Sequence, residues 1–153
     1  MKYTTGEEIT NSKLNDRRGY DWTGVYARMT TSQSIPTDTL TKVQINIKVY
    51  DSGDNFNITT FRYTAPEPGL YLILAQLKYQ APVADKSYTV EIEKNGNQIA
   101  VATKHASLVY DLDTEVFGIF SLVQNDYIEI FTSHGSGADR YLEFANLFII
   151  RIA

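Results

Sequence analysis

The chain has 153 residues, no cysteine and a formal net charge of −4. This length suits one domain with its own hydrophobic core, and the lack of cysteine excludes a disulfide framework and thiolate chemistry. The acidic balance argues against a nucleic-acid-binding surface, and the longest apolar run, Leu70 to Ala75, is too short to cross a bilayer.

Residues 1–25 are polar and predict an arm in front of the main domain. The first ten residues lack the apolar run of a signal peptide, so we expect a soluble chain. One short helix is predicted after the N-cap residue Thr10, with Ile9 and Leu14 as its hydrophobic staple. Because two helical turns are marginal alone, we expect the arm to dock onto another surface. The residues predicted to make this contact are Ile9, Leu14, Tyr20 and Trp22.

Residues 26–153 are predicted to form an all-β head domain. About nine strands follow one another with short connections and no helical pattern, which is typical of a sandwich or barrel. The segment "KVQINIKVY" alternates, which predicts one half-buried strand with every apolar residue from Val43 to Val49 on the same face. "FNITTFRYT" is predicted as one further strand. Asn95-Gly96 is predicted as a hairpin turn, because both residues tolerate positive φ.

The strand from Leu70 to Tyr79 differs from the others because it is apolar on both faces. A strand of this kind is expected to be covered on both faces, one of them by the core of the domain. One face carries Leu70, Leu72 and Leu74, and the other carries Tyr71, Ile73, Ala75, Leu77 and Tyr79.

The segment "FRYTAPEPGLYLILAQL" resembles the signature of the globular head of complement C1q, a jelly roll related to tumour necrosis factor (TNF). That signature has an aromatic residue, a proline-rich corner, glycine and then tyrosine, which correspond to Phe61, Pro68, Gly69 and Tyr71. "VEIEKNGNQIA", "VFGIFSLVQNDYIEIFT" and "LEFANLFIIRI" resemble later strands of the family in the same order. The resemblance implies a jelly-roll β-sandwich.

Two asparagines depart from the family pattern, since Asn125 and Asn146 stand where the family usually has glycine. A second resemblance concerns the arm. "TTGEEITNSKLNDRR" is similar to a segment near the start of many phage tail, fibre and minor structural proteins, and "ARMTTSQSIPTDTLTKVQIN" is similar to the beginning of phage versions of this jelly roll. Together the two segments imply a viral structural protein of a bacteriophage.

The chain contains eleven Tyr and seven Phe, which must be placed in cores, interfaces or binding surfaces. Because related jelly rolls form homotrimers, the resemblance implies that a trimer axis covers the second face of the Leu70–Tyr79 strand. The alternative is that these aromatic residues all lie in the core of one chain. The predicted trimer interface consists of Tyr71, Ile73, Leu77, Tyr79, Phe117 and Tyr127.

Catalytic motifs are not recognisable in the sequence, so no enzyme is predicted and no cofactor or metal is assigned. Ser133, His134 and Asp139 could be combined into a triad, but neighbours in one flexible loop do not make a preorganised site. Two acidic runs, "YDSGDN" and "YDLDTE", could bind calcium through oxygen ligands, although acidic residues in turns are usually only turn formers.

The resulting hypothesis is a non-enzymatic virion structural protein, a trimeric decoration protein of a phage capsid or tail attached by its N-terminal arm. The first alternative is a host-attachment knob of a tail fibre or head fibre that binds a surface receptor or glycan with its loops. A cellular carbohydrate-binding or adhesion module is the second alternative. No membrane insertion is expected. The residues predicted for the ligand loops are His134, Asp139, Arg140 and Asp85.

Overall fold

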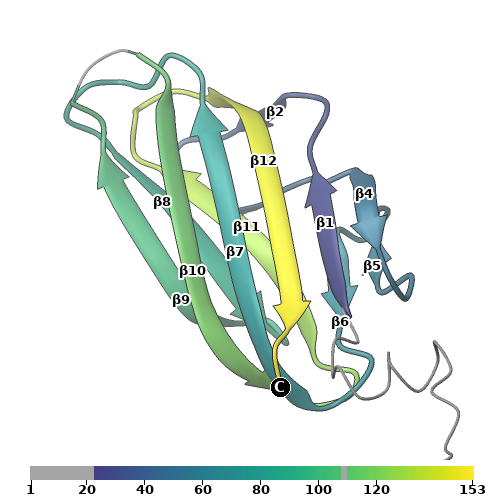
Figure 1. The fold of residues 1–153 in the computed structure, drawn as a ribbon. Helices are drawn as coiled ribbons and strands as arrows, with labels where there is room; N and C mark the ends of the chain where they lie inside the picture. The colour runs from purple at the N-terminus through teal and green to yellow at the C-terminus, as the bar shows by residue number, and fades with distance from the viewer. Residues whose placement is uncertain (1–22, 108–109) are drawn as a thin grey trace, which may run out of the picture.

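Two antiparallel sheets face each other in the computed structural model, which describes residues 23–107 and 110–153 (Figure 1). The predicted arm helix, with Ile9, Leu14, Tyr20 and Trp22, lies outside the described residues. Sheet A has the order β10 (Leu112–Leu122), β7 (Gly69–Tyr79), β12 (Arg140–Arg151), β1 (Gly24–Arg28) and β4 (Ile47–Asp51), with β2 (Gln33–Ile35) paired to β12. Sheet B has the order β5 (Phe56–Asn57), β6 (Arg62–Thr64), β11 (Tyr127–His134), β8 (Ser87–Lys94) and β9 (Asn97–His105), with β3 (Thr41–Lys42) paired to β11.

The core lies between the two sheets and is formed by alternate residues of each strand. Tyr88, Val90 and Ile92 of β8 point inward, as the period of two predicts. From the opposite sheet, β7 contributes five consecutive inward positions, none of which is exposed to solvent: Tyr71, Ile73, Ala75, Leu77 and Tyr79. Strands that alternate in this way on both sides produce the predicted all-β sandwich.

Two of the predicted strands are wrong in detail. "KVQINIKVY" is divided, because the chain leaves sheet B after β3 and joins sheet A as β4. Val43 is therefore buried, while Val49 is exposed beside a β-bulge in the pairing of β4 with β1. "FNITTFRYT" forms the short hairpin β5–β6, because the Asn57 side chain accepts hydrogen bonds from the amides of Thr59 and Thr60 and turns the chain.

The predicted Asn95-Gly96 hairpin is confirmed. It joins β8 and β9, with φ of 53° at Asn95 and 76° at Gly96. Asn125, which stands in place of a family glycine, has φ of 71°, so asparagine adopts the left-handed conformation there. The two turns are tied together, because the Asn95 side-chain amide donates to the Asp126 carboxylate at 2.6 Å.

The proline-rich corner before β7 is fastened by the C-terminal residues. Arg151 donates to the carbonyl oxygen of Pro68 through Nε at 3.2 Å and Nη2 at 3.1 Å, and its Nη1 lies 3.2 Å from the Glu67 carboxylate. A Cβ on Gly69 would lie 2.3 Å from the carbonyl oxygen of Ala153, so only glycine permits this close approach. The corner is therefore a structural joint between β7 and β12.

The two ends of the sandwich differ. The described chain starts at the end where the C-terminus lies, and the amide of Arg151 donates to the carbonyl of Thr23 there (Figure 1). We call this end the base. The loops after β7, β9 and β11 meet at the opposite end, which we call the loop end (Figure 1).

Candidate interaction surface

The outer face of sheet A is apolar over the half that is nearer the base. Strand register places its side chains in rows across the sheet. One row runs through Phe117, Leu74, Phe148, Tyr26 and Tyr50, and the next runs through Ile119, Leu72, Ile150 and Gly24. Leu70 continues the apolar surface toward the base. Several of these side chains are well exposed, among them Phe117 at 68% and Ile119 at 58%. Soluble domains rarely expose a continuous apolar surface unless it binds something.

The half of this face nearer the loop end carries more polar and charged side chains, although Phe144 lies in the row of Lys78. Gln76 and Lys78 follow the leucines on β7, and Glu115 and Asp113 follow Phe117 on β10 in the same rows. Lys78 Nζ lies 2.8 Å from the Asp111 carboxylate and 3.5 Å from that of Glu143. The hydrogen bond to Asp111 raises the pKa of Lys78 above its ordinary value. The sheet thus presents an apolar half and a charged half.

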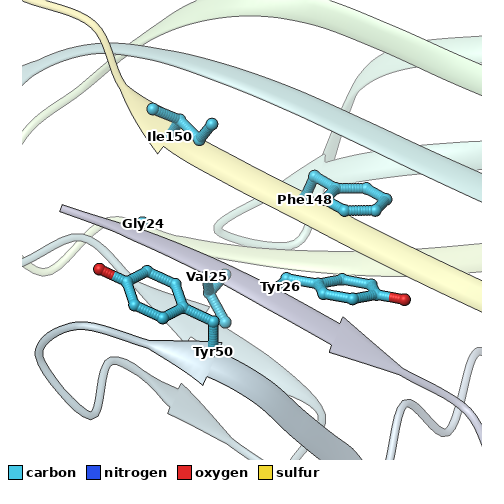
Figure 2. A pocket seen from close by; sticks show the side chains of 6 residues that line it. All are labelled: Gly24, Val25, Tyr26, Tyr50, Phe148 and Ile150. Carbon is cyan, nitrogen blue, oxygen red and sulfur yellow. The ribbon is translucent and has the colours of Figure 1, made fainter. Parts of the chain in front are cut away.

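A hollow of about 200 Å³ lies at the β1–β4 side of the apolar half (Figure 2). The rings of Tyr26 and Phe148 stack at one side of it, with centroids 4.4 Å apart and planes 6° from parallel. Tyr50 bounds the hollow on the other side (Figure 2). A Cβ on Gly24 would lie 2.7 Å from the carbonyl oxygen of Ile149, so the position stays free of a side chain. The hollow is lined by Gly24, Val25, Tyr26, Tyr50, Phe148 and Ile150.

Four residues of the predicted trimer interface were assigned to the wrong face of β7. Tyr71, Ile73, Leu77 and Tyr79 have no exposed surface in a single chain, so none remains for a second chain to cover. Their alternate neighbours, Leu70, Leu72 and Leu74, point outward instead.

Phe117 does lie on the exposed apolar face, on the edge strand β10. Tyr127 lies on β11 of the other sheet, where its ring is covered by the Arg62 guanidinium at 3.7 Å. Tyr127 is therefore separated from the apolar face by the thickness of the sandwich. Only Phe117 of the six predicted residues belongs to this surface.

Two of the core tyrosines have hydrogen-bond partners for their hydroxyl groups inside the chain. The Tyr79 hydroxyl lies 2.8 Å from Thr132 Oγ1, and the Tyr71 hydroxyl donates to the Glu67 carbonyl at 2.7 Å. Burial raises the pKa of Tyr79, which keeps the phenol neutral. A buried tyrosine with a partner loses little by leaving water, so its polar tip does not mark it as a surface residue.

His134 was predicted in a ligand loop, but it is a core residue with 3% exposure. Its Nε2 lies 2.9 Å from the carbonyl oxygen of Ile35, and its Nδ1 lies 3.0 Å from Ser136 Oγ. The ring also stacks on Tyr88. Both nitrogens are thus engaged with groups other than Ser133 and Asp139, so the structure does not assemble the triad.

The other predicted loop residues lie at the loop end. Asp85 is exposed with φ of 61°, and Asp139 lies 3.5 Å from Ser34 Oγ. Arg140 is half-buried at the start of β12. Their part in ligand binding stays a prediction.

Of the two acidic runs considered for calcium, "YDSGDN" contains a turn, whereas Asp113 and Glu115 of "YDLDTE" lie in strand β10. The Asp51 carboxylate accepts hydrogen bonds from the amides of Asn55 and Phe56, and Asp54 pairs with Lys48. Within residues 23–107 and 110–153, no three carboxylate or imidazole groups are placed to hold a metal ion together. The same residues contain no helix that is long and apolar enough to span a membrane.

No protein-family model matches the sequence, and no curated protein matches it. Solved structures match over most of the chain. The globular domain of zebrafish complement 1qA has a TM-score of 0.67 at 16% identity, covering 85% of this chain and 97% of that one. Murine APRIL at pH 5.0 has a TM-score of 0.65 at 15% identity, covering 86% and 100%.

The fold is a C1q/TNF-like jelly roll. A viral protein shares it, since the vertex protein P5 of phage PRD1 has a TM-score of 0.61 at 18% identity, covering 85% of this chain and 73% of that one. Identities this low establish the architecture of the jelly roll and leave its activity to be argued from its surfaces.

Four outward-facing residues of the jelly roll, Tyr26, Tyr50, Phe148 and Ile150, were not predicted as site residues. A signal for two of them was present in the sequence. In "ANLFIIRI" of β12 both alternate sets are apolar, as they are in β7. Two such strands paired side by side indicate a sheet that is covered on both faces.

Proposed function

We propose that the chain is a non-enzymatic structural protein of a virion, whose jelly-roll head forms a homotrimer and is held on a capsid or tail by residues 1–25. The observation that carries this proposal is the apolar half of the outer face of sheet A, in which Phe117, Ile119 and Tyr50 are more than half exposed. A surface of this composition resembles the interface of an obligate oligomer.

The trimer is supported by the fold and by the place of the apolar face. C1q/TNF-like jelly rolls generally form trimers. The face spans β10, β7, β12 and β1, and its rows of Phe, Leu, Ile and Tyr continue across all four strands. A single chain offers the face to water, whereas association would bury it.

The virion assignment rests on two similarities. The arm and the following segment are similar to phage structural proteins in sequence, and the jelly roll is similar in fold to the vertex protein P5. The geometry of the head agrees with attachment by the arm, because the described chain begins at the base, opposite the loops (Figure 1). An arm that starts at the base can fix the head while the loops face away from the particle.

Co-sedimentation with purified particles from the same source tests this function. The full chain is expected to pellet with particles, and a chain lacking residues 1–22 is expected to stay in the supernatant while it remains a trimer by light scattering. A full chain that does not bind particles, or that is monomeric at micromolar concentration, would contradict the proposal.

A second candidate function is a host-receptor knob, and the loop end favours it. Tyr110 is 75% exposed there, two residues before β10, and Asp85 and Asp139 are exposed in other loops of the same end. Exposed loops on a rigid sandwich are where recognition residues usually lie. A receptor knob would bind purified host envelopes, and Tyr110→Ala would weaken that binding without affecting attachment to particles. If Tyr110→Ala had no effect on envelope binding, this candidate would lose its support.

A further inference from the structure

We propose that two copies of the chain meet through one specific contact, in which Phe117 of one protomer enters the Tyr26–Tyr50–Phe148 hollow of the next and Glu115 lies against Arg28. This inference rests on the proposed homotrimer and names the contact that would build it. The proposed occupant of the hollow is a second copy of the chain.

The projecting residues and the hollow lie at opposite sides of one sheet face. Phe117 is on the edge strand β10, and the hollow lies between β12, β1 and β4. From β10 to β1 there are three steps between paired strands, or about 14 Å. Phe117 therefore cannot reach the hollow of its own chain, and a neighbouring copy can supply the ring.

The hollow has the size and the lining that a phenyl ring needs. It measures about 200 Å³, and its walls are the apolar parts of Val25, Ile150 and three aromatic rings. An apolar cavity of about 150 Å³ is sufficient to bind benzene. The hollow is therefore large enough to receive the ring of Phe117.

Strand register adds a charge pair to this contact. Phe117 lies in the same row across the sheet as Tyr26, and Glu115 lies in the same row as Arg28. A rotation about an axis parallel to the strands does not change the height of a residue along them. If Phe117 of one copy reaches Tyr26 of the next, Glu115 reaches Arg28 at the same time. Both charged residues are exposed in the single chain.

The proposed contact does not by itself determine how many copies the oligomer contains. With its axis parallel to the strands, a three-fold ring keeps the heights of these residues, and so does a face-to-face pair, so both allow Phe117 to meet the hollow. A ring in which each protomer gives Phe117 to one neighbour and receives it from the other is a heterologous contact that closes. The experiment must therefore report the contact and the number of copies independently.

Engineered cysteines can do this, because the natural chain has none. The variant E115C/R28C is oxidised mildly and analysed on a denaturing gel. A bond within one chain is excluded, since the two positions are about 14 Å apart and a disulfide needs Cα atoms within about 7 Å. The single variants E115C and R28C are controls, and E115C/E91C is a matched double control because Glu91 lies on sheet B.

The expected result is a covalent trimer from E115C/R28C, with no comparable product from the three controls. A covalent dimer would support the contact and overturn the homotrimer. A protein that is a trimer in solution but gives no cross-linked product would overturn the contact and leave the homotrimer standing. Cross-linking that occurs only after deletion of residues 1–22 would mean that the arm fills the hollow, and would also overturn the contact.

Charge reversal provides a test without cysteines. Glu115→Arg and Arg28→Glu each place like charges together, and each is expected to weaken association about tenfold or more. The double variant E115R/R28E restores opposite charges and is expected to associate within about threefold of the natural chain. Glu91→Arg makes the same change in net charge on the other sheet and should have no effect. Two weakened single variants without recovery in the double variant would contradict the pairing.

Discussion

Alanine substitutions at Ile73 and at Phe117 test separately what the inner and the outer face of sheet A contribute to stability. Ile73 of β7 and Gly118 of β10 are paired in register, so Phe117 lies one residue from the partner of Ile73. Ile73 has no exposed surface and points into the core, whereas Phe117 is 68% exposed on the outer face. Ile73→Ala should therefore lower the stability of each chain, and Phe117→Ala should mainly lower the stability of the oligomer.

The two effects have different magnitudes. Truncating a fully buried isoleucine to alanine costs about 2–5 kcal/mol, because a cavity remains in the core. Full burial of a phenylalanine is worth about 1.5–3 kcal/mol, so covering the exposed two thirds of Phe117 contributes about 1–2 kcal/mol per contact. A closed ring of three contacts would then lose about 3–6 kcal/mol in Phe117→Ala.

Urea unfolding at several protein concentrations, together with sedimentation equilibrium, measures both quantities. Ile73→Ala should lower the unfolding midpoint even at the lowest concentration, where the natural chain is dissociated. Phe117→Ala should keep that limiting midpoint close to the natural value and shift the association equilibrium toward monomer. An unchanged association constant in Phe117→Ala would refute the argument that the outer face of sheet A joins the copies.

Three further predictions concern interactions within one chain. Arg151→Ala removes two hydrogen bonds to Pro68 and should cost about 1–2 kcal/mol in urea unfolding, while an unchanged midpoint would show that the corner holds without them. The hydrogen bond from the amide of Val123 is the main cause that lowers the pKa of Asp126 below its ordinary value of 3.8, so its carboxylate stabilises the fold above that pH and loses the effect as the pH falls through the lowered pKa. Asp126→Asn should thus be less stable than the natural chain at pH 7, with the difference shrinking below about pH 3.8, and a difference independent of pH would contradict this. Glu129→Gln weakens a nearly buried carboxylate contact with two cations and should cost about 1–3 kcal/mol in thermal or urea unfolding, whereas a neutral result would mean that solvent replaces the contact.

The sequence predicts the fold of this chain well because its local signals agree with one another. Asn95-Gly96 predicts a tight turn, the alternation of β8 predicts which of its side chains face the core, and the prolines before Gly69 predict a corner. The structure contains all three features. The segment that contains Val43 and Val49 was predicted less well. Alternation describes which residues share a face of a continuous strand, and it contains no information that the chain changes sheets within that stretch.

The orientation of β7 could not be predicted from its own residues. When both sets of side chains are apolar, the period of two separates them but does not say which set meets the other sheet. The number of aromatic residues and the family resemblance suggested an interface on the tyrosine side of β7, yet Tyr79 and Tyr71 are buried and have hydrogen-bond partners inside the chain. His134 was misplaced for a similar reason, since its polar contacts with Ile35 and Ser136 depend on segments that are distant in sequence or folded by the loop.

The two outer faces of the sandwich differ in how their aromatic rings are covered. On sheet B the aromatic rings are covered within the chain, with Arg62 over Tyr127 and Lys42 over Phe131. The buried Glu129 carboxylate joins the two cations, with Lys42 Nζ at 2.6 Å and Arg62 Nε at 2.9 Å. This network gives each ring a charged cover, so sheet B can face water without a partner chain.

On the apolar half of sheet A, no cation among the described residues covers the ring of Phe117. The charges of this sheet, such as Lys78 and Glu115, lie in the rows nearer the loop end, while Phe117 and Ile119 remain exposed. Because the charged residues lie in the rows nearer the loop end, they could align two copies while the apolar rows of both copies are buried together. Among the described residues, some aromatic rings lie in the core and others are covered by cations on sheet B, while Phe117 on sheet A stays exposed to water, from which association with a second copy would remove it.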